Sequence, residues 1–89
     1  MYNINDMSKK QQLDKNMKLT VKLADFIVSH PKVNSNIPSG ASIVPFSASD
    51  NILNMMNEKL IPGLKEEGKT VVKAKETKST KEPWEFITL

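Results

Sequence analysis

Apolar residues recur every three or four positions between residues 13 and 29, which is the spacing of one face of an α-helix. One set comprises Leu13, Met17, Val21, Ala24 and Val28. An adjoining set comprises Leu19, Leu23, Phe26 and Ile27, and the remaining face carries Lys15, Lys18, Lys22 and Asp25. We therefore expect an amphipathic helix over residues 13–29 that ends at His30, because the residue before a proline avoids the helical region.

The next segments predict a loop and a short strand. Residues 31–40, PKVNSNIPSG, consist mainly of residue types found in turns, and residues 41–46 are short, apolar and rich in β-formers. Proline has no backbone N–H, so Pro45 belongs at the end of a strand or on the edge of a sheet.

A second helix is expected to begin near Ser49 or Asp50, where helical spacing of apolar residues resumes. Gly68 stands where a glycine C-cap would end it. Pro62 falls inside the apolar repeat, and a mid-helix proline removes one backbone hydrogen bond and clashes with the preceding turn. We therefore expect a kink, or a new short helix, at Pro62.

Two further strands complete the predicted fold. Residues 70–77 alternate between apolar and charged positions, as expected for a strand with one solvated face, and residues 84–89 form a last apolar segment. A strand–helix–strand unit of this length favours a parallel pair, and the last segment can return antiparallel. The pattern predicts a two-layer α/β fold: helix, strand, helix, strand and third strand, forming a small mixed sheet with helices on one face.

The length and composition are those of one small globular domain. The chain has 89 residues, of which 38% are hydrophobic and 26% charged. We expect a single domain over residues 13–89 after a polar, flexible segment at residues 1–12. No stretch approaches the roughly 18 apolar residues of a membrane span, and the first residues lack the apolar core of a signal peptide. Together with the absence of Cys, this predicts a cytoplasmic protein.

The positive charge comes entirely from lysine. The net charge is +3, and all 13 basic residues are Lys. Arginine provides the planar fork that grips phosphate and guanine with two hydrogen bonds, whereas lysine is a hydrated point charge. The composition therefore argues against a nucleic-acid reader. Weak binding to polyanions remains an alternative, through Lys15, Lys18, Lys22, Lys73 and Lys75.

Three stretches carry a resemblance to a known family. ADFIVSHPKV ends the first predicted helix, IPSGASIVPFSASDN holds the first strand, and EEGKTVVKAK joins the second helix to the next strand. The segment from Asn16 to Lys75 resembles an uncharacterised family of short prokaryotic proteins with this order of motifs. The motifs are turns and caps, so the resemblance implies a fold and no activity.

The turn FSASDN raises the possibility of an anion site. Where a strand passes into a helix, free helix amides favour anions, and Ser47, Ser49 and Asn51 would form the cradle. However, the turn has no glycine, and Asp50 places negative charge where an anion would sit. Helix capping by Ser47 or Ser49, with Asp50 complementing the helix dipole, accounts for the same residues.

The sequence indicates no catalytic, cofactor or metal site. His30 is the only histidine, Cys is absent, and the carboxylates of the second helix share it with lysines, as on a solvated face. We therefore expect a protein that is not an enzyme.

The C-terminal segment PWEFITL places large apolar side chains beside a very small sheet. They either complete the core of their own domain or pair the sheet edge with a second molecule, in which case the interface comprises Trp84, Phe86, Ile87 and Leu89. The function favoured by the sequence is that of a small interaction or structural protein that forms a homodimer. The alternatives are binding of a small anion at residues 47–51 and weak, lysine-mediated nucleic-acid binding.

Overall fold

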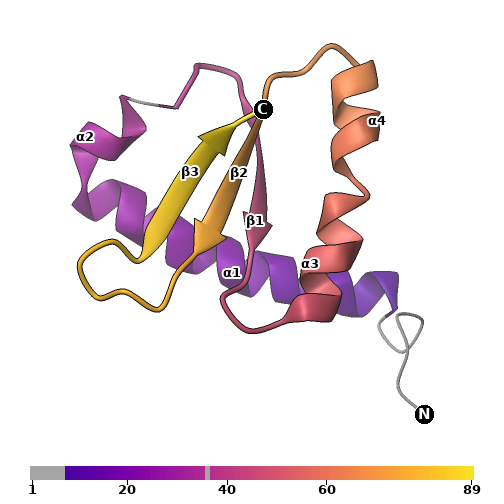
Figure 1. The fold of residues 1–89 in the computed structure, drawn as a ribbon, viewed down its shortest axis with the longest axis horizontal. Coiled ribbons are helices and arrows are strands. Elements are labelled where there is room, and N and C mark those ends of the chain that lie inside the picture. Colours follow the sequence, from indigo (N-terminus) through magenta and orange to yellow (C-terminus); the bar gives the residue numbers. More distant parts are fainter. Residues whose placement is uncertain (1–7, 36) are drawn as a thin grey trace.

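The computed structural model describes residues 8–35 and 37–89. A three-stranded sheet in the order β1-β2-β3 forms the centre of the molecule (Figure 1). β1 and β2 are parallel, and β3 runs antiparallel to β2. The elements are α1 (Lys9–Ser29), α2 (Pro31–Asn34), β1 (Ser42–Phe46), α3 (Asn51–Glu58), α4 (Ile61–Glu66), β2 (Val71–Glu76) and β3 (Trp84–Thr88). The predicted α/β class and mixed sheet are confirmed.

The first helix begins earlier than its apolar pattern indicates. Ser8 caps α1 by accepting a hydrogen bond from the backbone N–H of Gln11, and the Gln11 side chain accepts one from the Ser8 backbone, which together form a capping box. Residues 9–12, expected in the flexible segment, are therefore helical, while residues 1–7 lie outside the described part of the chain. None of the helices described is long and apolar enough to cross a membrane.

The segment after His30 departs from the prediction. His30 is the C-cap of α1, as expected, but residues 31–34 form the short helix α2 instead of a loop. Proline is favourable in the first turn of a helix, because its fixed φ suits the helix and its missing N–H has no partner there. Pro31 therefore ends one helix and begins the next.

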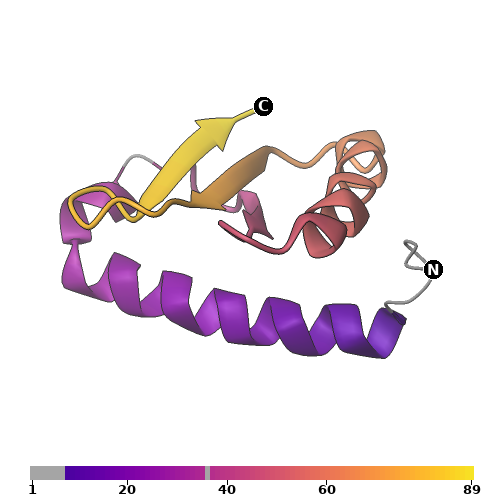
Figure 2. The ribbon, with the colours of Figure 1, turned by 60° about the horizontal axis from the view of Figure 1, so that its bottom comes forward.

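Only one of the two apolar sets on α1 faces the sheet. α1 lies as a separate layer across one face of the sheet (Figure 2). Leu19, Leu23, Phe26 and Ile27, the inner stripe, pack against Ala74 of β2 and Trp84 of β3. The outer stripe comprises Leu13, Met17, Val21, Ala24 and Val28. Its four larger side chains are 60–79% exposed, so the outer stripe contributes little to the core.

The opposite face of the sheet is only partly covered. α3 and α4 lie alongside β1 (Figures 1 and 2). Ile61 of α4 packs with Val44, Phe46 and Val71 in a second apolar cluster, and Lys73 lies over the Phe46 ring at 5.0 Å from its centroid. The predicted break at Pro62 is confirmed, since α3 ends at Glu58 and a new helix begins at Ile61 with proline in its first turn.

A buried asparagine joins three elements of the fold. Asn57 of α3 is 0% exposed, and its Nδ2 donates to the Pro45 carbonyl of β1 and to Asn16 Oδ1 of α1, at 2.9 and 2.8 Å. Its Oδ1 accepts from Gln12 Nε2 and Asn16 Nδ2, both at 2.9 Å. All the hydrogen-bonding capacity of the amide is therefore used. The network holds the N-terminal half of α1 against α3 and the edge strand β1.

We expect Asn57→Leu to lower the free energy of unfolding by about 1–3 kcal/mol, because it leaves the Pro45 carbonyl without its partner. Asn57→Asp keeps the shape but removes both donated bonds and buries a carboxyl, whose pKa should rise. A raised pKa means that stability is present at low pH and is lost as pH rises above about 4. Urea midpoints between pH 4 and 7 should therefore fall for Asn57→Asp relative to Asn57→Leu. If the difference in urea midpoint between the two variants does not change with pH, the side chain at position 57 is not buried.

Candidate functional site

The turn between β1 and α3 is held together by its own side chains. Ser47 Oγ accepts hydrogen bonds from the backbone N–H groups of Ser49 and Asp50, at 3.2 and 3.1 Å. Asn54 Oδ1 accepts from the Ser47 N–H at 2.7 Å, and its Nδ2 donates to the Ser47 carbonyl at 2.9 Å. The turn is therefore ordered by contacts within the chain, with no ligand required.

The cap of α3 is Asp50 and not Ser47 or Ser49. Asp50 Oδ1 accepts from the Leu53 backbone N–H at 3.0 Å, and Glu76 Oε1 of β2 accepts from the Ala48 N–H at 3.1 Å. The role of Glu76 is not apparent from the sequence, because Glu76 lies 28 residues beyond Ala48 and is brought to the turn by the parallel pairing of β1 and β2. Two carboxylates thus occupy amides that an anion would need.

The proposed anion residues do not converge on one point. Ser47 is directed into the turn, whereas Ser49 and Asn51 are exposed. Beside them lies an open groove of about 360 Å³ between α1 and the turn, which is lined by three lysines of α1, namely Lys15, Lys18 and Lys22. Lys15 Nζ lies 3.0 Å from Asp50 Oδ2, and Lys22 Nζ lies 3.5 Å from Glu76 Oε2. Lys15 and Lys22 therefore face the two carboxylates of the turn, whereas Lys18 lies 3.6 Å from Asp14 Oδ2 on its own helix.

The charge of Asp50 is stabilised by this arrangement. The hydrogen bond from the Leu53 N–H holds the pKa of the Asp50 carboxyl below its ordinary value, with a further contribution from Lys15. Partial burial opposes this shift without reversing it. Asp50 is therefore ionised at neutral pH, which suits a helix cap and repels a second anion.

The five lysines proposed for nucleic-acid binding do not share one surface. Lys15, Lys18 and Lys22 lie on α1, whereas Lys73 and Lys75 lie on the face of β2 that turns away from it, since the intervening Ala74 packs on α1. Lys73 also pairs with Glu58 at 2.9 Å. A continuous basic track along all five is absent from this arrangement.

The only histidine has a structural role at the end of α1. His30 Nδ1 lies 2.9 Å from the Phe26 carbonyl oxygen, which can only accept, so the ring donates from Nδ1. The imidazole also stacks on the Phe26 ring, with 4.2 Å between centroids. Within residues 8–35 and 37–89, no three metal-ligating side chains are grouped closely enough to hold an ion.

The C-terminal segment forms β3, and its side chains divide between core and surface. Trp84 is 8% exposed and belongs to the core under α1, and Phe86 stacks on Phe26 with 6.5 Å between ring centroids. Of the four residues proposed for an interface, Ile87 and Leu89 remain exposed. Trp84 therefore packs within its own domain, and only Ile87 and Leu89 remain available for contact with another molecule.

The largest run of exposed apolar side chains is the outer stripe of α1. Next to it lies an apolar pocket of about 150 Å³ between α1 and the edge strand, lined in part by Ala24, Ile27, Ile43 and Pro45. Both stripes are evident in the sequence, but the apolar pattern does not indicate which one is exposed. One feature of the sequence distinguishes the two stripes. The polar residues Gln12 and Asn16 share a helix face with Leu19 and Leu23, so burial of that face requires a polar partner inside the domain.

Acidification should reveal the role of Asp50. Because its pKa is lowered by folding, its contribution to stability is present above the ordinary value of 3.8 and is lost as pH falls through the lowered value. Asp50→Asn keeps a capping oxygen without the charge, so its urea midpoint should fall less than that of the wild type between about pH 5 and pH 2. Asp50→Ala should cost about 0.5–2 kcal/mol at pH 7. Identical pH profiles for the wild type and Asp50→Asn would refute this role.

Comparison with known proteins identifies a family whose function is unknown. Searches of curated proteins and of solved structures each returned no match. A family of unknown function, DUF5647, matches residues 11–83, from the first turn of α1 to the residue before β3. This agrees with the resemblance to an uncharacterised family that the motifs indicate. The chain belongs to the DUF5647 family, a family of unknown function.

Proposed function

We propose that this protein is a non-catalytic interaction module of the cytoplasm that associates with a second copy of itself. The observation that carries the proposal is the exposure of the outer stripe, in which Leu13, Met17, Val21 and Val28 follow one another along α1. Single exposed apolar residues are ordinary, but a contiguous row of them is typical of a protein–protein contact. Covering the row would remove its apolar surface from water, which favours association.

The edge of β3 is the second surface that can support self-association. β3 pairs with β2 on one side only, so its other side presents unpaired backbone groups. Ile87 and Leu89 would add apolar contacts beside such a pairing. Because Trp84 belongs to the core, removing the C-terminal segment would unfold the domain, and Ile87→Lys is the appropriate way to test this edge.

Binding of a small anion is the alternative function, and the lysine-lined groove beside residues 47–50 favours it. Asp50 and Glu76 oppose it, because they already accept from the amides of the turn. If an anion binds there, Asp50→Asn should tighten binding of inorganic phosphate, measured by calorimetry, by removing a like charge. No heat with either form at millimolar phosphate would exclude this alternative.

Weak nucleic-acid binding, the other alternative, would show as salt-sensitive retention on a polyanion column.

Val21→Glu should weaken self-association roughly tenfold or more, because it places a charge in the centre of the outer stripe. The position is 60% exposed in the isolated chain and glutamate is a good helix former, so the domain should remain folded. Sedimentation equilibrium between low and high micromolar concentration measures the effect, with circular dichroism to verify the fold.

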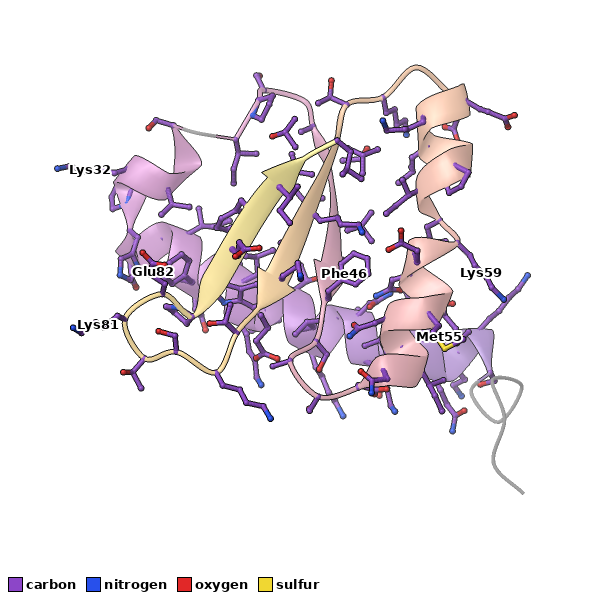
Figure 3. The ribbon with its side chains drawn as sticks, viewed as in Figure 1. Lys32, Phe46, Met55, Lys59, Lys81 and Glu82 are labelled. Carbon is purple, nitrogen blue, oxygen red and sulfur yellow. The ribbon has the colours of Figure 1, made fainter. Side chains whose placement is uncertain are left out.

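Met55→Glu is the matched control. Met55 is 54% exposed and lies on α3 (Figure 3), whereas the outer stripe belongs to α1. This variant should associate as the wild type does. A wild-type protein that stays monomeric at high micromolar concentration would refute the proposed function. A Met55→Glu variant as impaired as Val21→Glu would show that the effect lacks specificity for α1.

A further inference from the structure

We infer that the outer stripe binds the outer stripe of a second copy, with the two α1 helices antiparallel and a two-fold axis passing between Val21 and Ala24. The inference rests on the proposed self-association and assigns it a surface, an orientation and a register. α1 forms the outermost layer of the molecule on its side, with no other described element beneath it (Figure 2). The outer stripe is therefore accessible along its whole length.

The spacing of the outer stripe suits pairing of two helices. Met17, Val21, Ala24 and Val28 are separated by four, three and four residues, which is the alternation of the core positions in a coiled coil. The segment from Met17 to Val28 spans about 18 Å of helix. A contact of this length lies at the small end of specific interfaces, so the dimer should be weak and dependent on concentration.

The charges beside the stripe select the antiparallel orientation. Lys18 and Asp25 lie on the same flank of the stripe, seven residues or two helical turns apart. Within one chain Lys18 lies 3.6 Å from Asp14, but both side chains of this pair are exposed, so such a pair contributes little and Lys18 can exchange partners. In an antiparallel pair the same flanks of both helices face each other, so Lys18 of each copy meets Asp25 of the other. In a parallel pair in register, each residue beside the contact would face its own counterpart in the second helix. Asp14 would then face Asp14 and Lys10 would face Lys10, and like charges repel.

The same residues select the register. With the axis between Val21 and Ala24, Met17 packs opposite Val28 and Val21 opposite Ala24. The four layers between Met17 and Val28 are therefore apolar, and Leu13 lies outside the paired segment. Shifting the second helix by one heptad places Asp14 opposite Ala24 and Lys18 opposite Lys18. That alternative buries a charge and opposes two like charges, and both are unfavourable. A two-fold arrangement in which i meets j and j meets i is the usual form of a homodimer.

The contact need not be limited to a single row of side chains. The 150 Å³ apolar pocket opens beside Ala24, between α1 and the edge strand β1, on the flank opposite Lys18. Its lining includes Thr20, Ile27 and Ile43. The apolar surface of the stripe therefore continues on one flank, while the charged pair borders the other. This combination of an apolar centre and a charged rim is common at interfaces.

Charge reversal tests the pairing of Lys18 with Asp25. Lys18→Glu and Asp25→Lys should each weaken dimerisation roughly five- to thirty-fold, because two equivalent exposed pairs become repulsive. The double variant should recover most of the wild-type affinity, and the differences should shrink at high salt. Lys59→Glu, at the C-cap that follows α3, is the control for the change in net charge and should leave dimerisation unchanged (Figure 3). A double variant no stronger than the single ones would overturn the pairing.

Disulfide formation tests orientation and register independently, since the natural chain has no Cys. In the inferred dimer Met17 meets Val28, whereas each residue lies about 16 Å along the axis from its own counterpart. Met17→Cys and Val28→Cys should therefore stay uncrosslinked when oxidised separately and form a covalent dimer when mixed. Crosslinking of Met17→Cys alone would indicate a parallel pair and overturn the inference. If Ile87→Lys abolishes the dimer and Val21→Glu does not, the inferred pairing of α1 helices is overturned. The proposed self-association would then stand, through the edge of β3.

Discussion

The buried amide of Asn57 determines how the long helix is placed. α1 carries two adjoining apolar stripes, and burial of apolar surface alone distinguishes poorly between them. Gln12 and Asn16 share a face with Leu19 and Leu23, and their bonds to Asn57 fix the rotation of the helix about its axis. A buried amide left without partners costs about 1–3 kcal/mol, so the polar network favours the orientation with the inner stripe inside.

The exposed stripe follows from that rotation. Once Gln12 and Asn16 face Asn57, Met17 and Val21 must point away from the sheet. At its N-terminal end α1 therefore turns the polar side chains of Gln12 and Asn16 inward and exposes Leu13 and Met17, a local reversal of the usual amphipathic pattern. This reversal is what relates the core of the domain to the proposed interaction surface.

The turn before α3 illustrates how the fold uses its own charges. Parallel pairing of β1 with β2 brings Glu76 to the amide of Ala48, and Asp50 accepts from the first turn of α3. Lys15 and Lys22 of α1 then lie near these two carboxylates. The turn thus links the helix layer to the sheet through ion pairs. Its backbone amides, which an anion would need, are occupied by the chain's own carboxylates.

Local rules within the sequence determined most elements. The proline rule placed the end of α1 and the break before α4, and alternation placed β2, because these effects act within one or two turns of chain. Local rules missed α2, since a turn-rich composition also permits one helical turn after Pro31. The tertiary structure alone decided the buried stripe, the burial of Trp84 and the role of Glu76 at the turn. Each depends on partners more than twenty residues away, which no local pattern encodes.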